Sequence, residues 1–303
     1  MQVRPVLQFL VVVLFWGLSW IAIKFQLGVT SPGWSVAFRF LIAGSVLLGW
    51  CALRGQPLAM PRQAWPFLLV VGFFQFVLNF NLVYSAEQYV PSAIPAIAFA
   101  VMMVPNAILA RIFLKRRTNG RFVLGSLLGI AGVAMLFAQQ LRVGPDRATT
   151  LLGLLLVTGA VLSSSFINVL QATPRATSFP PLAGLAWSML AGAVMDGALS
   201  LLLTGPPVID PDPRYWIALF YLALLAGAVA FAVYFDLIRR IGPAEAAWTG
   251  VLVPILAMAI STVAEDFPWT PSSALGSLLA LAGLAMALAR PKPEAASSRL
   301  MPR

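Results

Sequence analysis

The stretch GSLLGIAGVAM at residues 125–135 is written again as GSLLALAGLAM at residues 276–286, with eight of its eleven residues unchanged. The copies are 151 residues apart in a chain of 303. Similarity at such a separation indicates a duplicated structural unit. Both copies are apolar and rich in glycine and alanine, as helices that pack closely inside a membrane are.

The composition of the whole chain also indicates a membrane protein. Hydrophobic residues make up 60% and charged residues 10% of the sequence, and the mean hydropathy is +0.89. A soluble domain does not have such a composition. There is no histidine and one cysteine, Cys51. Zinc, haem and Cys/His nucleophile chemistry therefore lack their usual groups, and we expect no cofactor and no metal.

Apolar runs of about 20 residues, the length that crosses about 30 Å of hydrocarbon, occur ten times. Short linkers with turn residues such as Pro and Gly separate them. The runs are continuous rather than alternating, which predicts helices and not a β-barrel. The ten predicted spans are residues 6–25, 34–53, 65–85, 91–113, 122–137, 151–171, 182–203, 215–238, 244–263 and 272–289.

The distribution of basic residues predicts the orientation of these spans. With the N-terminus in the cytoplasm, fourteen Lys and Arg face that side, whereas four face the other: Lys24, Arg142, Arg147 and Arg214. This excess follows the positive-inside rule and predicts both termini in the cytoplasm. The net charge of +10 then reflects topology, so no nucleic acid partner is expected.

Further landmarks recur in the same order at separations of 148 to 150 residues, close to the 151 of the opening stretch. They are Gly44 with Gly192, Tyr84 with Tyr234, and Pro105 with Pro254. Chance similarity between membrane helices is the alternative for any one pair, but it does not preserve the order of several. The fold class predicted is therefore an all-α membrane protein of two five-helix repeats, and since five is odd the second repeat is inverted.

We expect residues 1–143 to form the first repeat, residues 144–290 the second inverted repeat, and residues 291–303 a disordered cytoplasmic tail. Inverted repeats around a midplane site are typical of alternating-access carriers. Such carriers have interrupted helices at matching places in both halves. Pro105 and Pro254 fit this pattern, since each interior proline removes one backbone hydrogen bond. We predict a hinge role for both; the alternative is that prolines are common in membrane helices.

The sequence resembles the drug/metabolite transporter superfamily, specifically its ten-helix EamA-type exporters. The resemblance covers nearly the whole chain and rests on FWGLSW at residues 15–20, Pro32 followed by FRF at residues 38–40, the two mid-span prolines and the glycine-rich closing helix of each half. The family often has an acidic residue after the fourth helix of each repeat. Glu265 matches it in the second copy, whereas the first has KRR at residues 115–117.

The resemblance implies a carrier in the cell inner membrane, closest in character to aromatic amino acid exporters. It predicts export of aromatic, hydrophobic and other neutral amino acids from the cytoplasm through a central cavity, by a monomer that is not an enzyme. The alternative within the superfamily is a multidrug or nucleotide-sugar-like carrier. An intramembrane enzyme or a scaffold is a further alternative, but the sequence has no paired carboxylates for catalysis.

Polar and aromatic side chains in mid-span indicate where a substrate binds, because polar groups deep in a bilayer face protein or water. Uncharged donors and acceptors can hold both an ammonium and a carboxylate group, and aromatic rings can stack on an apolar side chain. Interhelical hydrogen bonds and core packing are the alternative roles. The predicted substrate-binding residues are Trp16, Trp20, Asn79, Asn81, Tyr84, Phe99, Met102, Asn106, Ser164, Asn168 and Trp248.

Two ionisable residues, Arg39 and Asp196, lie five to eight residues inside the outer ends of their spans. Their similar depth predicts an extracellular gate or a charge pair. The sequence is compatible both with proton coupling and with transport that follows the substrate gradient.

Overall fold

The computed structural model describes residues 3–115, 119–144, 146–241 and 246–289, and within these ranges it contains helices and turns only. The predicted tail at residues 291–303 lies outside the described residues. The first half comprises α1 (Val3–Lys24), α2 (Pro32–Leu53), η1 (Arg62–Ala64), α3 (Trp65–Val71), η2 (Gly72–Asn79), α4 (Phe80–Ala86), α5 (Ala93–Ala100), α6 (Met103–Leu114) and α7 (Gly120–Val143).

The second half has the same long helices in the same order, but its 3₁₀-helix η3 precedes the second long helix, whereas η1 follows it. It comprises α8 (Arg147–Gln171), η3 (Pro174–Thr177), α9 (Pro181–Thr204), α10 (Pro213–Phe220), η4 (Tyr221–Val229), α11 (Ala230–Ile241), α13 (Thr249–Ala264) and α14 (Pro271–Leu288).

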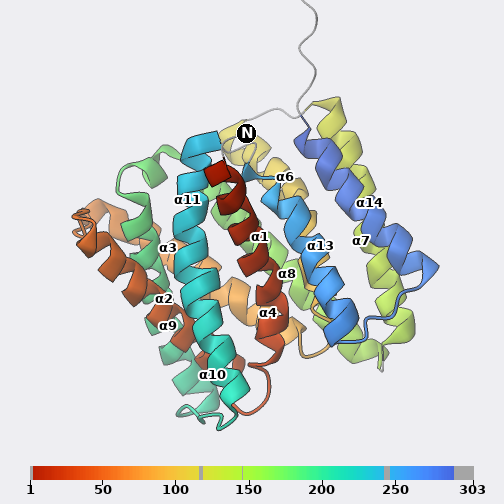
Figure 1. Cartoon of the computed structure of the whole chain (residues 1–303), viewed down its shortest axis with the longest axis horizontal. Helices are drawn as coiled ribbons and strands as arrows, with labels where there is room; N and C mark the ends of the chain where they lie inside the picture. Colours follow the sequence, from red (N-terminus) through yellow and green to blue (C-terminus); the bar gives the residue numbers. More distant parts are fainter. Residues whose placement is uncertain (1–2, 116–118, 145, 242–245, 290–303) are drawn as a thin grey trace, which may run out of the picture.

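These helices confirm the predicted membrane spans. In the described part of the chain, nine helical segments are long and apolar enough to cross a bilayer, and α13 is a shorter apolar helix. The predicted start of that span, at residue 244, lies outside the described residues. The helices run alternately up and down, so residues 3 and 288 lie at one end of the bundle, called here the near end (Figure 1). Lys24 and Ala264 lie at the opposite, far end.

The helices begin where the sequence provides caps. Asn119 and Asp146 accept hydrogen bonds from the backbone N–H of Phe122 and Thr149, both at 2.8 Å, which satisfies donors that a helix start leaves free. Thr270 and Ser273 form a reciprocal capping box at the start of α14. A proline occupies the first turn of α2, α9, α10 and α14. Its missing N–H costs nothing there, because that N–H would have no partner within the helix.

The predicted spans at residues 65–85 and 215–238 each contain a π-helix in the middle, η2 and η4. The two π-helices begin 149 residues apart, as Gly72 and Tyr221 show. π-helical turns are rare and occur frequently at functional sites. Their presence in both halves adds a structural feature to the duplication, and nothing in the local sequence predicts it.

The predicted span at residues 91–113 is interrupted at Val101 and Met102, between α5 and α6. Pro105 explains the position, because it has no N–H to donate to the carbonyl four residues earlier, which is that of Val101. The N–H of Val104 bonds to this carbonyl instead, at 2.9 Å. In the second half α13 begins after a turn that ends at Trp248, and Pro254 lies inside the helix. Both halves therefore have a break before the paired proline, while the hinge role stays a prediction.

The two repeated stretches, residues 125–135 of α7 and residues 276–286 of α14, lie face to face at one side of the bundle (Figure 1). A Cβ atom added to Gly132 would be 2.4 Å from the Gly276 carbonyl oxygen and from the Ala280 nitrogen. One added to Gly283 would be 2.4 Å from the Gly125 carbonyl oxygen. The close packing expected of these glycine-rich helices occurs between the two copies themselves.

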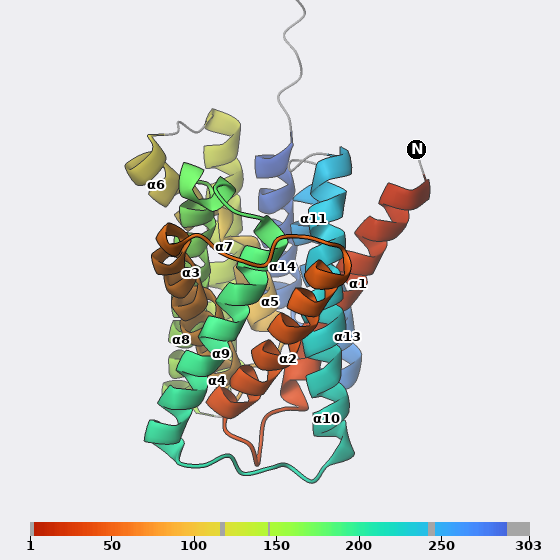
Figure 2. The same ribbon diagram turned by 90° about the vertical axis from the view of Figure 1, so that its left-hand side faces the viewer.

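A second close pair, α2 and α9, crosses in front in the view of Figure 2. A Cβ atom on Gly44 would be 3.0 Å from the carbonyl oxygen of Ala186. On Gly192 it would be 2.6 Å from Cβ of Phe76 in η2. The paired glycines of the sequence therefore mark places where helices of the two halves touch.

We predict that Gly132→Val lowers the melting temperature of the detergent-purified protein, because its side chain meets the backbone of α14, and overpacking costs about 1–3 kcal/mol. Gly49→Val is the matched control, since Gly49 lies inside α2 with nothing within 4 Å of an added Cβ. Thermal unfolding of both variants measures the difference. Equal melting temperatures would contradict the close α7–α14 contact.

Candidate substrate cavity

A cavity of about 500 Å³ lies between the two halves. Residues of α1, α2, η2, α4, α5 and α6 from the first half and of α8, η4, α11, α13 and α14 from the second line it. Its volume is within the range of small-molecule sites, about 300–1,000 Å³. Most lining side chains are apolar. Those with polar groups include Ser19, Arg39, Gln75, Asn79, Asn106, Ser164, Asn168, Tyr234 and Thr249.

Eight of the predicted substrate-binding residues line this cavity, although they come from five separate helical segments and a turn. They are Trp16, Trp20, Asn79, Phe99, Met102, Asn106, Ser164 and Asn168. Pro254 also lines it. Their binding role stays a prediction, but the fold does bring them together.

The other three predicted residues do not line the cavity. Asn81 is two positions after Asn79, and residues two apart on a helix point in different directions. It donates to Asp196 Oδ1 at 2.8 Å. Tyr84 is fully buried and donates to Gln26 Oε1 at 2.6 Å. Trp248 lies in the turn before α13 and is 36% exposed.

Aromatic rings form one wall of the cavity. The centroids of Trp20 and Phe99 are 5.4 Å apart in an edge-to-face arrangement. Trp16 lies 4.9 Å from Tyr234 and 5.3 Å from Phe231. These pairs join α1 of the first half to α5 on one side and to α11 of the second half on the other. Sequence reasoning did not include Tyr234 in the site, although its repeat partner Tyr84 was included.

The two π-helices line the cavity, and a carbonyl of each accepts a hydrogen bond from the side chain of another helix. Trp16 Nε1 donates to the carbonyl of Ala226 in η4 at 3.1 Å. Ser163 Oγ donates to the carbonyl of Phe74 in η2 at 2.7 Å. Trp16 and Ser163 are 147 residues apart and occupy equivalent places in α1 and α8. The first helix of each half thus donates a side-chain hydrogen bond to a carbonyl of the π-helix in the other half.

Arg39 is the only residue with a formal charge among the described residues that line the cavity. Its side chain is buried, and Nη1 donates to the hydroxyl oxygen of Tyr84 at 3.4 Å. Its guanidinium carbon lies 4.6 Å and 5.1 Å from the ring centroids of Phe80 and Phe40. Such cation–π contacts contribute about 2 kcal/mol when desolvated, less than the several kcal/mol that burying an ion costs.

The predicted charge pair of Arg39 with Asp196 is not formed: the ion pairs among the described residues do not include it. Asp196 accepts from Asn81 instead. The reason is that α2 directs Arg39 toward the cavity, whereas Asp196 does not line it. The alternative role of the two residues in a gate stays a prediction.

A polar cluster lies at the far end of the cavity. Lys24, at the end of α1, lies 3.4 Å from Glu265 Oε1 and donates to the carbonyls of Val90, at 2.8 Å, and Glu87. Glu265 also accepts from the backbone N–H of Ser92 at 3.1 and 3.2 Å, and from its hydroxyl. This far-end cluster, Lys24, Glu87, Ser92 and Glu265, joins the first half to the end of α13.

The cavity extends in the other direction. Asn168 belongs to the last turn of α8, Thr249 to the first turn of α13, and Leu288 ends α14. These helix termini lie at the near end of the bundle (Figure 1). The cavity therefore reaches the near end, whereas the far-end cluster bridges the halves at the other.

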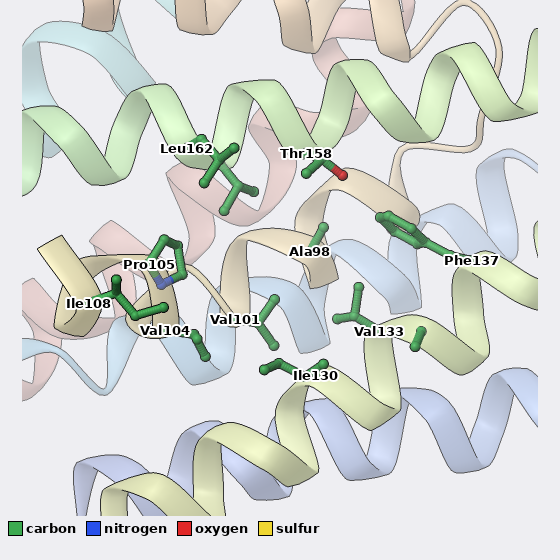
Figure 3. A pocket seen from close by; sticks show the side chains of 12 residues that line it. Ala98, Val101, Val104, Pro105, Ile108, Ile130, Val133, Phe137, Thr158 and Leu162 are labelled. Atoms are coloured by element: carbon green, nitrogen blue, oxygen red, sulfur yellow. The ribbon is translucent and has the colours of Figure 1, made fainter. Parts of the chain in front are cut away.

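A smaller apolar cavity of about 320 Å³ lies beside the break between α5 and α6. Figure 3 shows Val101, Val104 and Pro105 on one side of it, facing Leu162 of α8 and Val133 of α7. It contains no charged side chain among its lining residues. It gives the broken helix empty space next to Pro105.

Comparison with known proteins places the chain in a family. The EamA-like transporter family matches twice, over residues 3–138 and 151–289. The chain belongs to the EamA-like transporter family. It is thus a multi-pass inner membrane protein built to transport, as the resemblance implied. The two matches fall one in each half of the structure.

Relatives and a solved structure agree with this. The chain is 25% identical to an uncharacterized transporter of Buchnera aphidicola, over 83% of each chain. It is 24% identical to a probable amino-acid metabolite efflux pump of Escherichia coli, over 91% of each. A solved crystal structure shares the fold with a TM-score of 0.67 at 21% identity, covering 95% of this chain and 97% of that one.

The buried carboxyl group of Glu87, in the turn after α4, leads to a prediction of how the stability of the protein depends on pH. Its side chain is buried and both carboxylate oxygens lack a hydrogen-bond partner. Burial raises the pKa of Glu87 well above its ordinary value of 4.5; Lys24 opposes this and Glu265 adds to it. The folded state then holds the proton more tightly than the unfolded state. The stability that the folded state gains from holding this proton is fully present below pH 4.5 and is lost as the pH rises through the raised pKa of Glu87.

We therefore expect Glu87→Gln, which cannot ionise, to raise the melting temperature by about 2–4 °C at pH 8, the shift that about 1 kcal/mol produces. At pH 4.5 the variant and the wild type should unfold at similar temperatures. Asp266→Asn is the control, because Asp266 is exposed in the loop after α13 and its φ of 48° suits asparagine. A gain at pH 4.5 equal to that at pH 8 would contradict the prediction.

Proposed function

We propose that the protein exports amino acids, aromatic and hydrophobic ones in particular and other neutral ones with them, by alternating access. The observation that carries this proposal is the cavity between the inverted halves, with rings of Trp20 and Phe99 on one wall and amide and hydroxyl groups on others. An apolar side chain fits the rings, and the polar groups of an amino acid fit the amides. The name of the Escherichia coli relative supports the same substrate class.

We propose the predicted orientation as well, with the near end in the cytoplasm. The cavity then reaches the cytoplasm, where an exporter takes up its substrate, and the far-end cluster closes the outer side. Release requires the two repeats, residues 1–143 and 144–290, to move against each other. The contacts of Glu265 with Lys24 and Ser92 must break, and the interruptions before Pro105 and Pro254 are where the helices bend.

A multidrug carrier of the same superfamily is the second candidate. Extrusion of lipophilic cations calls for a negative group in the cavity, since an ammonium without a counter-charge is costly to bury. No carboxylate is among the described residues that line the cavity, and Arg39 makes it positive. The charge therefore favours an amino acid over a cationic drug. A nucleotide-sugar-like substrate is compatible with Arg39 and belongs in the test.

The direct test is counterflow in proteoliposomes with labelled tryptophan, methionine, threonine and a nucleotide sugar, each at two pH values. We expect exchange of tryptophan and methionine, and weaker exchange of threonine, because it covers less of the aromatic wall. A dependence on pH would indicate proton coupling. Exchange of the nucleotide sugar alone, or of none of the amino acids, would overturn the proposal.

We further predict that Trp20→Ala raises the half-saturating concentration of tryptophan by up to about tenfold, because an aromatic pair contributes about 0.5–1.5 kcal/mol beyond its buried area. The effect on threonine should be smaller. Trp50→Ala is the matched control, since Trp50 is 44% exposed on α2 and stacks on Arg54. Equal effects of both variants on tryptophan would contradict a role of Trp20 in the cavity wall.

The closure of the far end can be tested with a reporter cysteine at Ser19, which lines the cavity, in a chain whose buried Cys51 is replaced by serine. A membrane-impermeant thiol reagent added outside intact cells should label this cysteine slowly. Glu265→Ala should increase the labelling severalfold, because it removes the ion pair with Lys24 and the acceptor of Ser92. Asp266→Asn should not. Fast labelling from outside without Glu265→Ala would contradict the proposed orientation.

A further inference from the structure

Arg39 is a buried cation that faces the cavity and has no anionic partner. Its side chain is 5% exposed, and its Nε has no hydrogen-bond partner. The nearest acceptor that it uses is the Tyr84 hydroxyl, which is neutral, at 3.4 Å. No carboxylate among the described residues forms an ion pair with it: Glu265 pairs with Lys24, and Asp196 accepts from Asn81. The buried carboxylate of Glu87 acts on Arg39 only from beyond ion-pair distance.

The surroundings of Arg39 fix its guanidinium group in place. The Tyr84 hydroxyl donates to Gln26 Oε1 at 2.6 Å, so its lone pairs are left to accept from Nη1 of Arg39. The rings of Phe80 and Phe40 lie within 5.1 Å of the guanidinium carbon. These contacts orient the group but do not neutralise it. A planar guanidinium with free donors matches a carboxylate, which it can bind through two parallel hydrogen bonds.

The position of Arg39 within the cavity suits a bound substrate. Arg39 lies about two turns from the far end of α2, where the lining also includes Ile23 and Val83. The aromatic wall formed by Trp20 and Phe99 borders the same cavity. A carboxylate at Arg39 therefore leaves the remainder of the molecule among aromatic and apolar side chains.

We infer that Arg39 binds the carboxylate of the transported compound, and that the cavity selects substrates that carry a carboxylate and an apolar or aromatic group. This inference rests on the proposed export function and names the group by which the cavity recognises its substrate. The ammonium group contributes less to recognition, since no anionic side chain is among the described residues that line the cavity. A carboxylate without an amine is then a better ligand than an amine without a carboxylate.

The wild-type protein alone can test this in proteoliposomes loaded with labelled tryptophan. Three unlabelled compounds with the same indole ring are compared for their ability to drive exchange: tryptophan, indole-3-propionate, which lacks the amine, and tryptamine, which lacks the carboxylate. We expect tryptophan and indole-3-propionate to drive exchange and tryptamine to be at least tenfold weaker than either. Tryptamine that is equal to tryptophan, or stronger than indole-3-propionate, would overturn the inference.

Variants connect the selectivity to the residue. Arg39→Gln should raise the half-saturating concentration of tryptophan at least tenfold and remove the preference for indole-3-propionate over tryptamine. Arg39→Lys should retain part of that preference, because it keeps the charge but not the paired donors. Arg142→Gln is the matched control, since Arg142 is exposed in the last turn of α7. A merely structural role of Arg39 would lower the yield or the melting temperature and leave the preference unchanged, which would count against the inference.

The outcomes separate this inference from the proposed function. If labelled tryptophan is not exchanged, labelled indole-3-propionate is loaded in its place. Exchange of indole-3-propionate but of no amino acid would overturn amino acid export and support carboxylate recognition. Exchange of tryptophan and tryptamine alike would support transport of amino acids and overturn the role of Arg39. If Arg39→Gln does not fold, the wild-type comparison of the three indole compounds decides.

Discussion

A bilayer provides no water to bond with a peptide N–H or C=O, and the rest of this structure depends on that constraint. Backbone groups freed from regular helix hydrogen bonding must find partners inside the protein. The two π-helices and the two interrupted spans lie beside the central cavity, and side chains of neighbouring helices bond to their carbonyls. Trp16 bonds to Ala226, and Ser163 to Phe74. The irregular backbone thus borders the cavity between the halves, while the regular helices α7 and α14 join the halves through glycine contacts at one side of the bundle.

The two basic residues at and inside the cavity, Lys24 and Arg39, are subject to the same constraint. Lys24 reaches backbone carbonyls at the turn between α4 and α5 as well as the carboxylate of Glu265. Each of these partners lies just after the end of one helix or just before the start of the next. Arg39 lies deeper and has only a hydroxyl and two aromatic rings. One basic residue therefore holds the halves together at the far end, and the other is left with donors to spare inside the cavity.

The fold could be predicted from the sequence in most respects because hydrophobic length and charge asymmetry act over whole segments. The spans and the duplication follow from patterns of that kind, whereas the sequence predicted close packing of α7 and α14 without naming their partner. The site was harder, because it depends on the direction of single side chains. Trp16, Phe99 and Asn168 line the cavity, but Asn81 and Tyr84 on the same span as Asn79 point elsewhere. The π-helix that precedes them changes the residue spacing per turn, and no local sequence signal shows where a π-helix begins.

The ion pair of Lys24 with Glu265 is not repeated in the sequence at the positions that the duplication relates to it. By the repeat separations of 148 to 151 residues, the position of Lys24 corresponds to residues 172–175, and that of Glu265 to residues 114–117, which include the basic stretch 115–117. These stretches of the sequence contain basic residues but no acid, so they do not provide the acid and base that pair at the far end. Under the alternating access that we propose, the two closed forms of the protein therefore differ in free energy. In that proposed cycle the ion pair of Lys24 with Glu265 stabilises the form that is closed at the far end, which makes this form the preferred state of the empty protein.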